Sequence, residues 1–176
     1  MSEWGTKQFF DSMFKRDELD TIGDGWLIRW RGSQKLRYSL CLDILRPIFA
    51  QNGSMNVLDI GCALGDFTVQ VWRLNTENKF WGIDISADAI NYVSRKYPQI
   101  HLAVAALPEI PFREGSFDCV ICMEVLYYLD SKGRRQGIEN IHRALRKNGI
   151  LLFSGVLDGG ERYFAENEVI RLISEY

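Results

Sequence analysis

The stretch from Val57 to Thr68 constrains the fold of this chain more than any other part of the sequence. Apolar residues lead into Asp59, glycines follow at Gly61 and Gly65, and apolar residues at helical spacing come next. This order predicts a buried strand, a tight turn and a helix N-terminus. Such a turn lets backbone N–H groups approach a bound cofactor closely. We therefore expect an α/β fold with a ligand site at the end of this strand.

The spacing and charge of the turn indicate which kind of ligand it binds. A dinucleotide site prefers G-x-G-x-x-G, with no acid against the pyrophosphate. Here Ala63 replaces the second glycine, the last glycine is Gly65, and carboxylates occur at Asp59 and Asp66. Two anions repel a phosphate, but they suit a ligand with a positive end. S-adenosylmethionine carries a sulfonium and an ammonium, so we expect a methyl-donor site.

A second acid follows the next predicted strand. Residues 79–84 end in Asp84, about 20 residues past Gly61, where a parallel sheet presents a carboxylate to ribose hydroxyls. Ser86 is then expected to cap the following helix, which Pro98 ends. The second acid thus supports a site for a nucleoside-containing cofactor.

The whole chain predicts a doubly wound, mostly parallel sheet with helices on both faces, because strands and helices alternate. The expected strands are 55–60, 79–84, 100–105, 117–123 and 149–155, and the expected helices are 65–74, 86–97, 131–147 and 166–175. Before them we expect a short helix over 6–15 and a longer one capped by Ser33. The longer helix should bury a stripe of Leu36, Leu40 and Ile44 and end or kink before Pro47.

Length and composition fit a single domain of 176 residues. We interpret residues 1–32, rich in aromatic side chains, as a lead segment that forms a lid, and residues 33–176 as the cofactor-binding domain. The net charge of −2 argues against nucleic-acid binding, and no apolar run reaches a membrane span. No signal peptide is evident, so the cytoplasm is the expected location and no membrane partner is expected.

The four cysteines indicate neither a disulfide framework nor a metal site. Cys119 and Cys122 have C-x-x-C spacing, but residues three apart in a strand point to opposite faces of the sheet. They cannot chelate a metal together, and we read all four cysteines as small buried apolar residues. No metal site is therefore predicted.

These features together resemble the class I S-adenosylmethionine-dependent methyltransferases, a Rossmann-like family. Besides the two acids and the turn, the segments Phe117–Cys122 and Arg143–Phe153 are similar to this family, and the resemblance runs from about 56 to 156. It implies S-adenosylmethionine as the cofactor. The residues that it assigns to cofactor binding around the turn and the second strand are Asp59, Gly61, Cys62, Ala63, Gly65 and Asp84. The structural alternative is that the glycines only allow the tight turn to form and that Asp59 is a capping carboxylate.

Two features depart from the family pattern. Many relatives have an acid for the adenine amino group after the third strand, whereas this chain has Ala105, Ala106 and Leu107 there. Backbone groups near Ala106 and Leu107, with apolar stacking from Ile85, are expected to replace it. The family also closes its sheet with antiparallel strands, which are missing here. Because an open edge is a liability, we expect either a truncated chain or another form of closure, and favour truncation.

The block from Glu124 to Asp130 follows the fourth strand, at the end of the sheet where α/β sites lie. It resembles the nodulation protein S-type methyltransferases, which N-methylate an amino sugar on a chitooligosaccharide. Glu124 can accept a proton or a hydrogen bond from an amine, and the Tyr127 and Tyr128 rings suit a cation. A structural hydrogen bond for Glu124 and simple packing for one tyrosine remain open.

The sequence therefore predicts an S-adenosylmethionine-dependent methyltransferase, N- or O-directed, that acts on a small molecule or a saccharide. The alternative is a catalytically silent domain of the same fold that binds the cofactor or a partner. The basic and aromatic residues of 26–38, Arg37 among them, suit a glycan or an anion, or form a solvated helix face over aromatic packing. The acceptor and the oligomeric state are not predicted.

Overall fold

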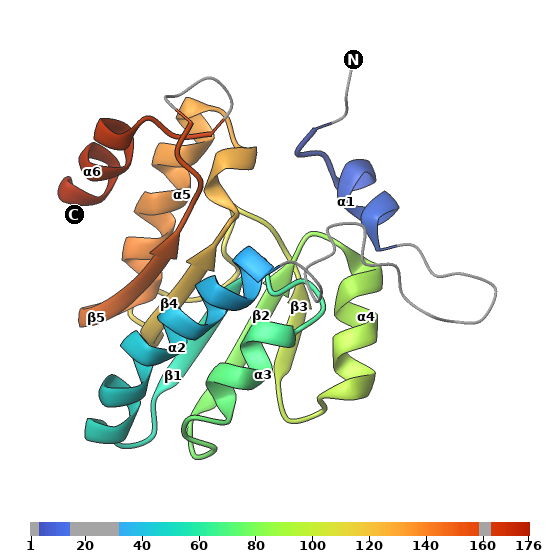
Figure 1. The fold of residues 1–176 in the computed structure, drawn as a ribbon, viewed down its shortest axis with the longest axis vertical. Helices are drawn as coiled ribbons and strands as arrows, with labels where there is room; N and C mark the ends of the chain where they lie inside the picture. Colours follow the sequence, from blue (N-terminus) through green and yellow to red (C-terminus); the bar gives the residue numbers. More distant parts are fainter. Residues whose placement is uncertain (1–3, 15–31, 159–162) are drawn as a thin grey trace.

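Five parallel strands form one sheet in the order β3-β2-β1-β4-β5 (Figure 1). The computed structural model describes residues 4–14, 32–158 and 163–176. The strands are β1 (Asn56–Ile60), β2 (Lys79–Asp84), β3 (His101–Val104), β4 (Phe117–Met123) and β5 (Leu145–Ser154). The predicted α/β fold with a parallel sheet is confirmed. Within the described ranges no strand pair in the sheet is antiparallel, and β5 lies at one edge.

The helices follow the predicted alternation. They are α1 (Lys7–Met13), α2 (Gly32–Gln51), α3 (Asp66–Trp72), α4 (Ala87–Lys96), the 3-10 turn η1 (Leu126–Tyr128), α5 (Ser131–Ala144) and α6 (Glu166–Ser174). Ser86 caps α4 as predicted, since its hydroxyl accepts a hydrogen bond from the Ala89 N–H at 3.3 Å. Among the described residues, no helix combines the length and the apolar character that a membrane crossing requires.

Two apolar layers cover the two faces of the sheet. Val57 and Cys119 pack in the layer beneath α2 and α3, whereas Leu58 and Cys122 pack in the layer beneath α5. This alternation is the period-two pattern of a strand that is buried on both faces. It confirms that Cys119 and Cys122 point to opposite faces, and both are free thiols.

The prediction for the buried face of α2 is wrong. Leu36, Leu40 and Ile44 are exposed. The residues of α2 that are buried are instead Cys41, Leu45 and Phe49. The helix also begins at Gly32, so that Ser33 lies inside it, and it runs through Pro47 to Gln51. Both stripes have helical spacing, and contact with β1 and α3 selects the one that is buried.

The junction between α5 and β5 also differs from the prediction. The helix ends at Ala144, not at residue 147, and β5 begins at once with Leu145. Asn148 has a φ of +62°, and the register between β4 and β5 shifts between Phe117 and Cys119. Asn148 and Gly149 therefore form an irregularity inside β5.

The correction to α2 gives a stability test. Leu45 is 0% exposed, so Leu45→Ala should lower the free energy of unfolding by about 2–5 kcal/mol. Leu40 is 56% exposed on the same helix, and Leu40→Ala should change it by less than about 0.5 kcal/mol. Urea denaturation of the two variants measures both values. A larger loss for Leu40→Ala would restore the original prediction.

Candidate active site

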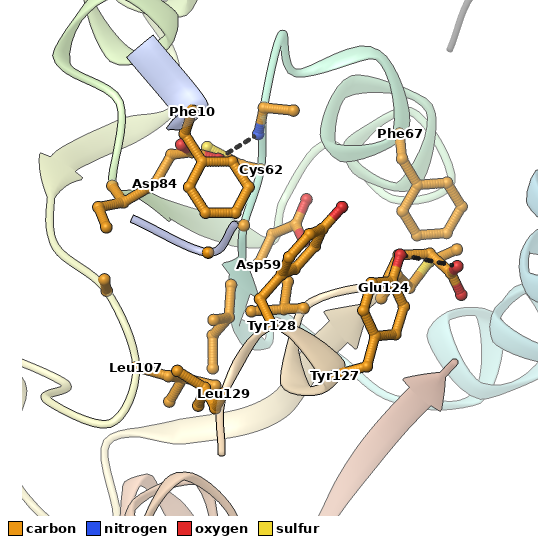
Figure 2. Close-up of a pocket in the computed structure, with 18 of the residues that line it drawn as sticks. Phe10, Asp59, Cys62, Phe67, Asp84, Leu107, Glu124, Tyr127, Tyr128 and Leu129 are labelled. Atoms are coloured by element: carbon orange, nitrogen blue, oxygen red, sulfur yellow. Dashed lines mark hydrogen bonds between the residues drawn. The ribbon is translucent and has the colours of Figure 1, made fainter. Parts of the chain in front are cut away.

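A cavity of about 320 Å³ opens at the carboxyl ends of the central strands (Figure 2). This is the size of a small-molecule site. It lies where the strand order reverses between β1 and β4, the position at which α/β sheets bind ligands. The predicted site residues that line it are Asp59, Gly61, Cys62, Ala63, Asp84, Ile85, Ala106, Leu107, Glu124, Tyr127 and Tyr128. Only Gly65, among the residues predicted, does not line it.

The glycine turn between β1 and α3 has three residues with positive φ. They are Gly61 at +73°, Ala63 at +47° and Gly65 at +72°. A Cβ on Gly61 would clash with the Val125 side chain, and one on Gly65 would lie 2.9 Å from the Val93 side chain. Gly65 thus serves turn geometry and packing, whereas Gly61 both forms the turn and lines the cavity. Ala63 holds a strained left-handed conformation, which glycine adopts more easily than alanine does.

Two buried carboxylates lie on one side of the cavity. Asp59 accepts a hydrogen bond from the Thr68 hydroxyl at 2.6 Å, and Asp84 accepts bonds from the N–H groups of Ala63 and Ser86, each at 2.9 Å. Burial raises the pKa of Asp59 to about 7, and the nearby charge of Asp84 adds to this rise. Burial also raises the pKa of Asp84. Among the described residues neither acid forms a salt bridge, so this side of the cavity favours a cation.

Glu124 lies on the other side of the cavity, just after β4, with a φ of +59°. Its backbone N–H donates to the Ser154 carbonyl at 2.9 Å, and its carboxylate accepts a bond from the Ser154 hydroxyl at 2.9 Å. The Tyr127 hydroxyl donates to it at 3.3 Å, and an Arg37 nitrogen lies 3.4 Å away. A glutamate in the left-handed region is strained, and such strain gathers at functional sites.

The two tyrosines of η1 have different surroundings. Tyr127 is buried against Tyr163 and Phe164, and its burial raises the pKa of the phenol well above the usual value, so that it stays a hydrogen-bond donor. Tyr128 projects into the cavity between Asp59 and Tyr127 (Figure 2). The centre of its ring lies 4.8 Å from that of the Trp4 ring and 4.9 Å from that of the Phe10 ring.

The N-terminal segment reaches the cavity from the far end of the sequence. Gly5, Phe10 and Phe14 line it, beside the ring contacts of Trp4 and Phe10 with Tyr128. Phe10 and Phe14 thus form part of one wall, and Trp4 packs behind it against Tyr128. Trp26 and Trp30, also assigned to the lead segment, lie outside the described residues, and the boundary at residue 32 stays a prediction.

Arg37 is the site residue that the sequence left undecided. It lies on α2, lines the cavity and contacts Gln34 and Glu124, both through Nη1. Within the described part of the chain, Nε and Nη2 form no hydrogen bond, and these two groups are an edge of the guanidinium that can bind a carboxylate in a bidentate way. The mixed basic and aromatic pattern of 26–38 was the only signal for it.

The loop after β3 lines the cavity with apolar residues, as the sequence suggested. The Ala106 carbonyl accepts a bond from the Glu109 N–H at 2.9 Å. The backbone N–H groups of Ala106 and Leu107 form no hydrogen bond to any described residue. Within the described part of the chain these two N–H groups are left without a protein partner, and Ile85 is one of the apolar residues that line the cavity.

Comparison with solved structures agrees with this geometry. The N-methyltransferase NodS from Bradyrhizobium japonicum WM9, in complex with S-adenosyl-L-homocysteine, superposes with a TM-score of 0.78 and 25% identity. The match covers 97% of this chain and 85% of NodS. This neighbour agrees with the resemblance carried by the block after β4.

Curated relatives have diverse acceptors in their names. The chain is 27% identical over 122 residues to the tRNA N(3)-methylcytidine methyltransferase Mettl2 of Drosophila melanogaster, covering 62% of this chain and 38% of the relative. It is 30% identical over 111 residues to the O-methyltransferase rstn1 of Aspergillus nomiae, covering 59% and 48%. The chain thus spans less than half the length of both relatives. A family model described as a methyltransferase domain matches residues 57–149, and the chain therefore belongs to the class I S-adenosylmethionine-dependent methyltransferases.

Proposed function

We propose that this chain transfers a methyl group from S-adenosylmethionine to an amine on a small molecule, with amino sugars as the first candidates. The observation that carries the proposal is the position of Glu124. Its backbone is strained, and its carboxylate lies beside the tyrosines of η1 and across the cavity from two buried acids. The likeness to NodS, which is named an N-methyltransferase, supports the same choice.

The side of the cavity formed by Asp59 and Asp84 suits the cofactor. Asp84 would accept bonds from the ribose hydroxyls, because its two oxygens have four lone pairs and its backbone hydrogen bonds do not use all of them. Asp59 would face the positive methionine end. The free N–H groups of Ala106 and Leu107 would serve the adenine, with Ile85 against its face, while Gly61, Cys62 and Ala63 form the floor. The free edge of Arg37 would bind the methionine carboxylate.

The side formed by Glu124 suits the acceptor. When bound, the cofactor supplies an activated methyl group, and the protein's task is to hold a nucleophile about 3 Å from it and in line. An amine must be neutral to attack, because a protonated nitrogen has no lone pair. Glu124 would accept the amine proton or orient the N–H, and Tyr128 would place an aromatic face beside the cation that forms.

Other acceptors remain as outcomes of the same assays. An oxygen acceptor, a nucleic acid or a silent domain would each leave the amine panel unmethylated. The relatives include an O-methyltransferase and a tRNA methyltransferase, so the expectation that the chain binds no nucleic acid stays a prediction. A panel of glucosamine-containing oligosaccharides, simple phenols and tRNA separates these readings, and labelled cofactor reports the methylated product.

The cofactor assignment predicts the effect of Asp84→Ala. The variant should weaken S-adenosylhomocysteine by about 1–3 kcal/mol, the effect of leaving ribose hydroxyls without an acceptor. Isothermal calorimetry measures the affinity, and NAD should show no comparable binding. The matched control is Asp88→Ala on α4, which does not line the cavity. Equal affinities for the two variants, or tighter NAD binding, would reject the assignment.

The raised pKa of Asp59 predicts a pH dependence of cofactor affinity. Below about pH 7 this carboxyl is protonated in the free protein, so it must lose a proton before it can pair with a cation. Affinity for S-adenosylhomocysteine should therefore rise from pH 6 to pH 8, by up to about tenfold for one pH unit of coupled proton loss. Asp59→Asn should flatten this rise, whereas Asp43→Asn, on the exposed side of α2, should keep it.

The acceptor assignment predicts the effect of Glu124→Gln. The change keeps the shape but removes the basicity, so turnover with an amine acceptor should fall by about 10²–10⁴-fold. Affinity for S-adenosylhomocysteine should change far less than turnover does, because Glu124 faces the acceptor and reaches the cofactor only through its contact with Arg37. The wild-type rate should rise with pH through the pKa of the amine or the base. Glu109 is exposed, so Glu109→Gln is the control variant and should keep the wild-type rate. Full activity of Glu124→Gln would show that Glu124 takes no part in the mechanism.

A further inference from the structure

Arg134, in the first turn of α5, is a buried cation that no step of the proposed chemistry uses. It is 9% exposed, and its guanidinium reaches back to the turn that carries the site tyrosines. Nε donates to the Leu129 carbonyl at 2.9 Å, and Nη2 donates to the Tyr127 carbonyl at 3.3 Å. Arg134 therefore fixes the backbone of η1 and the residue after it.

The same guanidinium holds the segment that follows β5. Nη1 donates to the Tyr163 carbonyl at 3.2 Å and forms an ion pair with Glu168 at 2.7 Å. The guanidinium carbon lies 4.5 Å from the centre of the Phe164 ring, a cation–π contact. One side chain thus joins two segments that are far apart in the sequence.

These two segments meet at the cavity. The rings of Tyr127 and Tyr163 lie 4.8 Å apart at 83°, and both residues line the cavity on the side of Glu124. The hydroxyl of Tyr127 donates to Glu124, so a shift of η1 would also move the partner of that carboxylate. The position of this wall depends on the backbone carbonyls of Tyr127, Leu129 and Tyr163, which all accept hydrogen bonds from the Arg134 guanidinium.

We infer that Arg134 is a positioning residue for the acceptor side of the cavity: it holds Tyr127 and Tyr163 in one wall. The inference rests on the proposed function only in calling that side the acceptor side. A buried guanidinium with several hydrogen bonds is costly to disrupt, because its loss leaves carbonyl groups unpaired. Arginine suits the task because its planar fork offers five donors in a fixed geometry, whereas lysine offers one compact ammonium group.

The test compares Arg134→Met, Arg134→Lys and the matched control Arg143→Met. Arg143 lies on the same helix, but it is 56% exposed and pairs with the exposed Glu114. Hydrogen exchange, followed by mass spectrometry, reports on peptides covering 126–129, 163–168 and strands β1 and β4. Calorimetry gives the affinity for S-adenosylhomocysteine, and methylation of the glucosamine-oligosaccharide panel gives KM and kcat for the acceptor.

In Arg134→Met, exchange should accelerate by about tenfold or more in both wall segments, the effect of losing hydrogen bonds to a charged group. Exchange in β1 and β4 and the affinity for S-adenosylhomocysteine should stay within about twofold. KM for an active acceptor should rise more than kcat falls. Arg134→Lys keeps the charge near Glu168 but should not restore the wall, and Arg143→Met should match the wild type.

Three results would overturn the inference. The first is faster exchange across the sheet as well as the wall, which marks a merely structural residue. The second is unchanged exchange in the wall segments, and the third is full rescue by lysine. If Arg134→Met does not fold, the lysine variant decides by the same readouts. The exchange data need no acceptor, so the inference can stand or fall separately from the proposed amine chemistry.

Discussion

The pairing of β1 with both β2 and β4 is the constraint on which the site depends. Ile60 at the end of β1 pairs with Ile83 of β2 and with Cys122 of β4, so three strands end at one level. The chain then leaves β1 toward α3 and leaves β4 toward η1, which opens a crevice between them. Residues that directly follow these strands must meet there, whatever their distance in the sequence.

This constraint explains why much of the fold and part of the site could be predicted from the sequence. Asp59, Asp84 and Glu124 lie within or just after buried strands, and the strands were recognisable from apolar runs and the glycine turn. Because the strands are parallel, the three acids must lie together at the carboxyl ends of the strands. Local pattern was enough because both the strand and its polar end are encoded within about six residues.

The rest depends on contacts that no local pattern encodes. The two faces of α2 both repeat every four residues, and only packing against the sheet decides that Leu45 is buried and Leu40 is exposed. Arg37 meets Glu124, and Arg134 meets Glu168, 34 residues away, through tertiary geometry. A charged residue in a helix is usually solvated, so sequence reasoning favours the surface for both arginines.

The charges on the two sides of the cavity differ in a way that bears on the proposed chemistry. Asp59 and Asp84 have raised pKa values and no cationic partner among the described residues, so a cationic ligand gains by pairing with them. Glu124 already faces Arg37 at 3.4 Å. Because only the neutral amine can attack, the proposed reaction requires a hydrogen bond at Glu124 and no charge pairing there, while the two acids opposite suit the cationic cofactor.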